Sequence, residues 1–342
     1  PPLLLQLGEA ELVEILAELG QPKYRAKQVL EWVYVKGETD FQKMSDLPAK
    51  LRNALSERVG VSGLSVAEEQ VSRDGTVKRA LRLGDGQLIE AVLMPYDDGR
   101  RTACISSQAG CGMRCAFCAT GQMGFARQLT AGEIFAQAAE YSCQLRRQEE
   151  RLSNVVFMGM GEPLANYNNV MEAVRRINAD LGIGARHITI STVGLAPRIR
   201  RLAQDVIAKE VPPVTLAVSL HAATDEKRSA MMPVNERYDL EELLAACREY
   251  TRVSRRRMTF EWALIDQEND SVEEAEALAR LLTRADLKGL CHVNCIPLNL
   301  TGGFEGKPAQ DQRVKRFLAT LEKRGIPATA RVRRGIDIDA GC

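Results

Sequence analysis

The sequence after residue 102 alternates between strand-like and helix-like segments, and this alternation constrains the fold more than any other feature. Six segments are predicted to be strands: 103–106, 154–158, 187–191, 215–220, 259–264 and 293–296. Helical segments separate or follow them at 131–148, 168–179, 197–208, 239–252, 272–285 and 310–324. Repeated strand–helix units fold as parallel strands wrapped by helices. The sequence therefore predicts an α/β fold, either an open sheet or a full or partial parallel (β/α) barrel.

Two further parts precede this core. Residues 9–58 have apolar positions at helical spacing and a break at Gly20-Gln21-Pro22, which predicts three short helices. From 61 to 95 the period changes to two, and Asp74-Gly75 and residues 84–86 supply turns, which predicts a β-meander. We expect three domains: a helical accessory module (1–60), a meander extension (61–100) and the core (101–342).

Composition excludes several classes of protein. The 342 residues can bury a large core, and no apolar run approaches the roughly 20 residues of a membrane span. The first residues lack the basic start of a secretory signal, although a chain that begins with Pro1 could have lost a targeting segment. Nine cysteines without a disulfide-scaffold spacing favour reduced thiols and a cytoplasmic location. A net charge of +1 leaves any RNA contact to local basic stretches.

The strongest local motif is Cys111-x3-Cys115-x2-Cys118, which follows the first predicted core strand. Three thiolates can hold three corners of a [4Fe–4S] cube and leave one iron open to another ligand. The alternative is a structural zinc site that recruits Cys104 as a fourth ligand, but zinc sites usually carry two separated C-x2-C pairs. The spacing therefore favours an iron–sulfur cluster over zinc.

This spacing is the signature of the radical S-adenosylmethionine (SAM) superfamily, whose open iron chelates the methionine group of SAM. Residues 104–111 (CISSQAGC), 158–164 (MGMGEPL) and 219–221 (SLH) further resemble the RlmN family of 23S ribosomal RNA adenine C2 methyltransferases. The similarity runs from the N-terminal helices to the last residue. It implies a radical-SAM partial or full barrel, one [4Fe–4S] cluster held by the three cysteines, and two SAM molecules per turnover. It also implies SAM ligands at Gly161, Glu162, Ser191, Ser219, Leu220, His221 and Asn299.

The positions of these residues support the same site independently. They follow or end several predicted parallel strands, whose carboxyl ends meet at one mouth. The glycines around Met160 would let the backbone approach a ligand, and Glu162 could accept a hydrogen bond from its amine. Each residue also has an ordinary structural explanation, because glycines form turns, serines cap helices and histidines are often buried core residues.

Two more cysteines bear on the chemistry. Adenine C2 lies between two ring nitrogens and is too electron-poor to attack the methyl group of SAM, whereas a thiolate can take that methyl group first. By resemblance, Cys342 is the methyl carrier, and a SAM-derived radical activates its S-methyl group for addition to C2. Cys104 then attacks the Cys342 sulfur, which releases methylated RNA and leaves a transient Cys104–Cys342 disulfide for external reduction.

By resemblance, Glu90 corresponds to the family's candidate for the base that removes the C2 proton, although an exposed strand glutamate is the ordinary explanation. Two features depart from the family. The interval from Glu90 to Cys104 is one residue longer than expected, and the sequence has Gly341 and stops at Cys342 where relatives commonly read Ala-Cys-Gly-Gln-Leu.

Several alternatives remain open from the sequence. A Cfr-like enzyme with the same cysteines would methylate C8, although Pro163 favours the C2 branch. A non-catalytic RNA-binding protein would use the metal only for stability, and a radical enzyme acting on protein or small molecules would turn over without RNA. We expect 23S rRNA and tRNA as partners, with an unstacked target base. We also expect a flavodoxin or ferredoxin as electron donor, no membrane and a monomer. The helical module and Arg255-Arg256-Arg257 could bind phosphates or be merely solvated.

Overall fold

The computed structural model describes residues 1–332 and 334–340, and within them ten strands form one continuous sheet. Its order is β1-β2-β3-β4-β7-β8-β9-β10-β11-β12. The strands are β1 (Ser65–Val71), β2 (Val77–Arg82), β3 (Leu88–Pro95), β4 (Arg101–Cys104), β7 (Asn154–Phe157), β8 (Ile188–Thr192), β9 (Thr215–Ser219), β10 (Met258–Leu264), β11 (Cys291–Pro297) and β12 (Ala328–Ala330). Neighbours from β4 to β12 are parallel, whereas β1 to β4 pair antiparallel.

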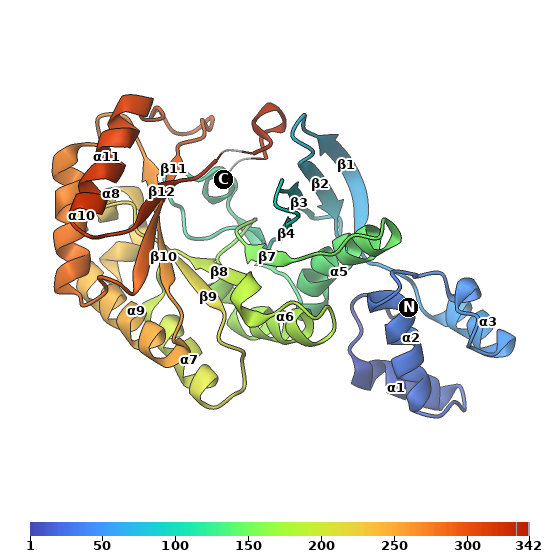
Figure 1. The fold of residues 1–342 in the computed structure, drawn as a ribbon. Helices are drawn as coiled ribbons and strands as arrows, with labels where there is room; N and C mark the ends of the chain where they lie inside the picture. The colour runs from blue at the N-terminus through green and yellow to red at the C-terminus, as the bar shows by residue number, and fades with distance from the viewer. Residues whose placement is uncertain (333, 341–342) are drawn as a thin grey trace.

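The sheet is a partial barrel. Its strand order is linear, with β1 and β12 at the two edges, and the described residues contain no pairing that would close it. The sequence left the open, partial and closed arrangements as alternatives, and the structure decides between them. The parallel part has one more strand than predicted, because β12 adds three residues beside β11. Figure 1 shows the helices of the core on the outer side of the curved sheet.

The helices that cover the core coincide with the predicted segments to within a few residues. They are α5 (Ala131–Arg147), α6 (Tyr167–Ala179), α7 (Ala196–Ile207), α9 (Leu240–Ser254), α10 (Val272–Arg284) and α11 (Asp311–Lys323). Local sequence fixes where several begin: Thr130 and Glu133 form a capping box on α5, and Asp239 and Ser271 cap α9 and α10. Their apolar faces pack on fully buried strand residues such as Ile190 and Leu216.

The three predicted N-terminal helices are α1 (Glu9–Glu18), α2 (Tyr24–Tyr34) and α3 (Ala49–Arg58). They lie beside α5 and α6, far from α9 to α11 (Figure 1). Arg176 of α6 donates to the carbonyl oxygens of Gln6 and Leu7 at 2.8 and 2.5 Å, and Arg147 of α5 donates to that of Gly37 at 2.8 Å. One hydrophobic core runs through these helices and the sheet, so the module is packed against the core rather than tethered to it.

The predicted meander is β1 to β3, which extends the main sheet through β4. The chain returns to this extension at its end, where residues 334–340, including the 3-10 helix η5 (Ile336–Ile338), lie beside the β1–β2 turn (Figure 1). We call residues 334–340 the C-terminal segment. None of the helices described has the length and apolar character needed to cross a bilayer.

Candidate active site

Several of the polar side chains that were predicted to form the site lie on one face of the sheet. Directly opposed residues on neighbouring strands point to the same face, as do residues two apart on one strand. Cys104 opposes Val92 and Val156, Val156 opposes Thr189, and Thr189 opposes Thr215. Stepping by two along these strands adds Glu90, Ser191 and Ser219 to the same face, whereas intervening residues such as Ile190, Leu216 and Val218 are fully buried. The sheet therefore places Glu90, Cys104, Ser191 and Ser219 on one surface.

The cysteine motif occupies a loop closed by a small hairpin. Strand β5 (Gln108–Gly110) precedes it, α4 (Ala119–Met123) follows it, and β6 (Phe125–Gln128) pairs back onto β5. Gly110 is required here, because its φ is +75° and a Cβ would lie 2.0 Å from the carbonyl oxygen of Gly124. The amide of Ala116 donates to the carbonyl oxygen of Met231 at 3.0 Å, which fixes the loop to α8 (Asp225–Met231) beyond the end of β9.

The three thiols share one environment. Cys111 and Cys115 are buried and Cys118 is half-buried. Burial raises the pKa of Cys111 to about 11 and that of Cys115 to about 12, and the neighbouring Cys118 thiol adds to both. A metal must therefore displace protons to bind. Among the residues described, no three His, Cys, Asp or Glu side chains are gathered closely enough to hold a metal ion.

The donor set of this loop fits an iron–sulfur cluster. Residues 111–118 supply three thiols, which are soft donors, and contain neither an imidazole nor the carboxylates that hard cations prefer. The fourth ligand of the zinc alternative, Cys104, packs with Val92 and Met94, whereas Cys115 belongs to a separate cluster with Met231 and Leu298. Cys104 is thus placed with the meander rather than with the cysteine loop.

The segment from Gly159 to Glu162 is packed against residues 105–108. A Cβ on Gly159 would lie 2.8 Å from the carbonyl oxygen of Ile105, and one on Gly161 would lie 2.5 Å from the Cβ of Gln108. The amide of Glu162 donates to Oε1 of Gln108 at 2.7 Å. These glycines allow a close approach of the chain to itself, and the approach of a ligand to the same glycines stays a prediction.

Glu162 is 2% exposed, and both of its carboxylate oxygens accept backbone amides. Oε1 accepts from Leu164 at 2.9 Å, at the start of the 3-10 helix η2 (Pro163–Asn166), and Oε2 accepts from Val193 at 2.8 Å, just after β8. Burial raises the pKa of Glu162 to about 7, although these hydrogen bonds oppose the rise. Each oxygen has a second lone pair, so the carboxylate can still accept from a ligand amine.

Ser219 ends β9, and Leu220 and His221 follow it with different orientations. The Leu220 side chain is fully buried in the core, and its backbone amide donates to the carbonyl oxygen of Glu261 at 3.0 Å. His221 has a left-handed φ of +62°, and its Nδ1 accepts from the amide of Ala263 at 2.8 Å. Its ring meets that of Phe117 edge-on at 4.7 Å, which joins the end of β9 to the cysteine loop. Burial lowers the pKa of His221 to about 3, so the imidazole is neutral.

The remaining predicted residues come from three separate parts of the chain. Asn299 is half-buried and lies two residues after β11. Glu90 of β3 is half-exposed and pairs with Lys78 at 3.0 Å. The proposed carrier Cys342 lies outside the described residues. The last described residue, Ala340, packs against the cluster formed by Val92, Met94 and Cys104.

Two residues of this region, Arg228 and Lys78, were not predicted from the sequence. Arg228 of α8 is fully buried and donates to the carbonyl oxygens of Val193, Ser219 and Leu220. Nothing in a short helix of mixed charge distinguishes a buried arginine from a solvated one. Lys78 contacts the C-terminal segment 261 residues away, a contact that no local pattern reveals.

The run Arg255-Arg256-Arg257 precedes β10 and therefore lies at the amino end of the strands, opposite the mouth. Arg256 and Arg257 donate to the carbonyl oxygens of Pro213 and Cys291 at 3.2 and 3.4 Å. Arg256 and Arg257 therefore link the start of β10 to neighbouring segments, and a phosphate contact of this run stays a prediction.

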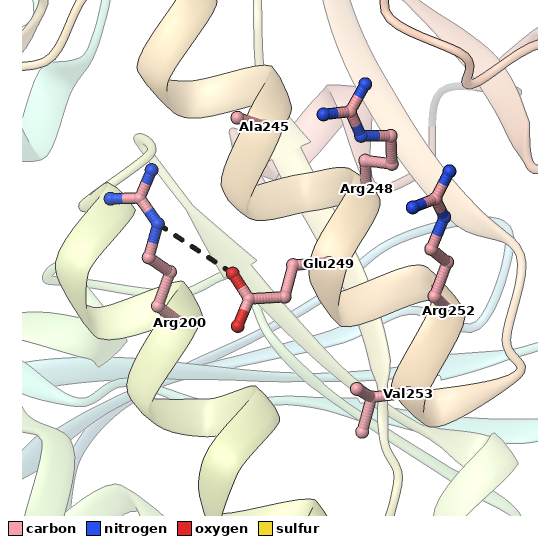
Figure 2. A pocket seen from close by; sticks show the side chains of 6 residues that line it. All are labelled: Arg200, Ala245, Arg248, Glu249, Arg252 and Val253. Carbon is pink, nitrogen blue, oxygen red and sulfur yellow. Dashed lines mark ion pairs between the residues drawn. The ribbon is translucent and has the colours of Figure 1, made fainter.

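The outer helical layer carries a surface groove that is separate from the strand ends. Figure 2 shows Arg200 of α7 directed toward Glu249 of α9, with Arg248 and Arg252 along the same helix. The Arg200 Nε and Glu249 Oε2 atoms are 3.8 Å apart. Since the groove is lined by α7 and α9 alone, it contains none of the predicted site residues.

Comparison with known proteins agrees with this site. Residues 105–282 match the radical SAM superfamily, and residues 3–61 match the ribosomal RNA large subunit methyltransferase N-terminal domain. The "Probable dual-specificity RNA methyltransferase RlmN" of Moorella thermoacetica is 48% identical over 97% of this chain and 93% of its own length. The "Dual-specificity RNA methyltransferase RlmN 1" of Myxococcus xanthus is 46% identical over 99% and 92%.

Among solved structures, a radical SAM methyltransferase from Sphaerobacter thermophilus superposes with a TM-score of 0.91 at 47% identity. The match covers 100% of this chain and 98% of the other. The resemblance drawn from the cysteine motif and its flanking residues is therefore confirmed over the whole length. The chain belongs to the RlmN family of radical SAM methyltransferases.

Proposed function

We propose that this enzyme methylates C2 of adenine in 23S rRNA and in tRNA, through a methylated Cys342. Its relatives are named dual-specificity RNA methyltransferases. The observation that carries the mechanism is the packing of Ala340 against the Cys104 cluster. Cys342 is two residues further on, and two residues span at most about 7 Å, so its sulfur can reach Cys104.

The proposed cofactor site is built from the cysteine loop and the strand ends. Cys111, Cys115 and Cys118 would each hold one iron of a [4Fe–4S] cluster. When bound, the cluster and SAM supply a 5′-deoxyadenosyl radical that activates the S-methyl group. Ser191 and Ser219 share the site face, and Gly161, Glu162, Leu220, His221 and Asn299 complete the proposed SAM ligands at the ends of neighbouring strands. The neutral His221 would offer a hydrogen bond without repelling the sulfonium charge.

The chain's own residues then have separate roles. The Cys342 thiolate takes a methyl group from the first SAM, which leaves as S-adenosylhomocysteine. After the carbon–carbon bond has formed, Glu90 accepts the proton from C2, and the unpaired electron left on the adduct would pass to the oxidised cluster. Cys104 attacks the Cys342 sulfur, so that a sulfur–sulfur bond forms and the bond from sulfur to the methylene carbon breaks. The methylene carbon takes a proton, and an external thiol reduces the disulfide.

We propose residues 1–60 as an accessory module that contacts RNA, 61–100 as the extension carrying Glu90, and 101–342 as the catalytic core. A flavodoxin or ferredoxin would reduce the cluster, and the enzyme would act as a monomer. The thiols require a reducing compartment, for which we propose the cytoplasm.

The test is product analysis after anaerobic reconstitution with iron, sulfide, reductant and SAM. Incubation with 23S rRNA fragments and tRNA, followed by nuclease digestion and mass analysis, should give 2-methyladenosine. Cys342→Ala should give none, whereas Cys143→Ala, which alters a buried cysteine of α5, should retain activity. Full activity of Cys342→Ala would contradict the carrier mechanism, 8-methyladenosine would establish the Cfr-like alternative, and a zinc protein without product would leave only RNA binding.

A further inference from the structure

We propose that Lys78 is a positioning residue for methyl transfer, which holds the Glu90 carboxylate and the C-terminal segment at one point. The inference rests on the proposed roles of Glu90 and Cys342. The contacts that support it join Lys78 to Glu90 and Asp339, which the structure describes. Lys78 lies on β2, outside every motif that the sequence analysis singled out.

The register of the sheet places Lys78 in line with Cys104. Lys78 opposes Val92 across β2 and β3, and Val92 opposes Cys104 across β3 and β4. Opposed residues share a face, so the Lys78 and Cys104 side chains project from the same side of the sheet. Glu90, two residues before Val92, projects there too and is the diagonal neighbour of Lys78.

The Lys78 ammonium group contacts both partners directly. Its Nζ atom lies 3.0 Å from Oε1 of Glu90 and 3.1 Å from the carbonyl oxygen of Asp339. The Lys78 side chain is 16% exposed, against 48% for that of Glu90. An ammonium group has three N–H donors, so one group can serve the carboxylate and the main chain at the same time.

Polar contacts hold the beginning of the C-terminal segment, and at its other end Ala340 packs against the cluster of Val92, Met94 and Cys104. The amide of Gly335 donates to Oδ2 of Asp74 at 3.1 Å, and the Asp337 carboxylate accepts from the Ser72 hydroxyl at 2.5 Å and the Arg73 amide at 3.2 Å. Lys78 binds at Asp339, only three residues before Cys342. Loss of Lys78 should therefore leave the segment docked at 335–337 and loosen the part that carries the thiol, where only the packing of Ala340 on the Cys104 cluster remains.

For the reaction, Lys78 would hold in place two groups that must act on the same adenine, the Glu90 carboxylate and the Cys342 sulfur. Glu90 has to reach the C2 proton while the Cys342 sulfur is bonded to the carbon attached to C2. A cation that binds both the carboxylate and the carrier's main chain fixes their separation before RNA arrives. Such prior positioning lowers the entropic cost of the reactive arrangement.

The experiment compares Lys78→Met with Lys78→Arg, which keeps a cationic donor, and with Arg82→Met, which removes a charge from the exposed end of the same strand. The first readout needs no RNA and no radical. The reconstituted full chain is treated anaerobically with oxidised glutathione, and the rate of Cys104–Cys342 disulfide formation is measured by peptide mass analysis. The second readout is amide hydrogen exchange in residues 334–340.

We expect Lys78→Met to slow disulfide formation roughly tenfold, to speed exchange near Asp339 and to lower kcat for RNA methylation more than it raises KM. Lys78→Arg should recover most of each effect, and Arg82→Met should show none. Wild-type disulfide and exchange rates in Lys78→Met would overturn the inference, even if that variant lost activity. If Lys78→Met fails to fold, Lys78→Gln takes its place under the same criteria.

These readouts separate the inference from the proposed function. A slow disulfide in Lys78→Met supports positioning of the segment, whatever the RNA product is. Loss of product in Cys342→Ala together with wild-type behaviour of Lys78→Met would overturn the inference alone. Retained product in Cys342→Ala would overturn the carrier mechanism, and with it the catalytic purpose of the positioning.

Discussion

Arg228 donates from one nitrogen, Nη2, to the carbonyl oxygens of Ser219 at 3.0 Å and Val193 at 2.6 Å. It therefore joins the ends of β8 and β9, on which the proposed SAM ligands Ser191 and Ser219 lie. Burial lowers the pKa of Arg228 to about 10, so the guanidinium keeps its charge at neutral pH. A further bond of 2.8 Å to Oδ1 of Asn235 completes its set of acceptors.

Arg228→Met should destabilise the protein by roughly 3–5 kcal/mol, because several buried acceptors lose their donor at once. SAM should also bind more weakly, since the ends of β8 and β9 are no longer joined. Urea unfolding and SAM titration of the reconstituted enzyme measure the two effects. Arg237→Met, at an exposed position nearby, is the control. A cost below about 1 kcal/mol for Arg228→Met would show that this link is dispensable.

Gly161→Ala should destabilise the protein more than Gly182→Ala. Both glycines have positive φ, +100° and +66°, so alanine strains the backbone at either site by about 1–2 kcal/mol. Only at Gly161 would the new Cβ also meet Gln108, at 2.5 Å, whereas nothing lies within 4 Å at Gly182. Chemical unfolding of the pair measures the cost of that collision together with the less favourable φ of Gly161, roughly a further 1–3 kcal/mol. Equal losses of stability in the two variants would mean that residues 105–108 can shift to accommodate the new Cβ without destabilising the protein.

Glu162 should make stability depend on pH between about 4.5 and 7. Burial raises its native pKa from 4.5 to about 7, so the native state keeps a proton that the unfolded chain has released. This contribution is fully present below pH 4.5 and is lost as the pH rises through 7, by at most about 3 kcal/mol. Glu162→Gln cannot titrate. The stability of the native sequence relative to this variant should therefore fall from pH 5 to pH 8 in urea unfolding; a constant difference would contradict the raised pKa.

The helices and strands of the core were predictable because their signals are local. Helices such as α7 and α10 bury one face at regular spacing, and polar residues such as Asp239 and Ser271 mark where helices begin. Strand β12 was missed because three residues are too few to show a period. The β5–β6 hairpin was missed because the cysteine loop interrupts it.

Most residues of the candidate site could be predicted from the sequence, but their contacts could not. Cysteine spacing pointed to the metal loop, and the order of strands and motifs pointed to the mouth. The partners of Gly161, Arg228 and Lys78 are set by tertiary packing, which brings residues 105–108 beneath one loop and residues 334–340 onto the meander. A sequence read along its length contains no signal for such contacts.

The central claim is that Cys111, Cys115 and Cys118 hold a cluster with one iron left open for SAM. Electron–nuclear double resonance on the reduced, reconstituted enzyme, with SAM labelled in its amino and carboxylate groups, tests this directly. We predict about four irons per chain and coupling of both labelled groups to the cluster, with iron lost in Cys118→Ser. A cluster without coupling to SAM, or a colourless zinc protein that forms no 5′-deoxyadenosine with reductant, would contradict the account.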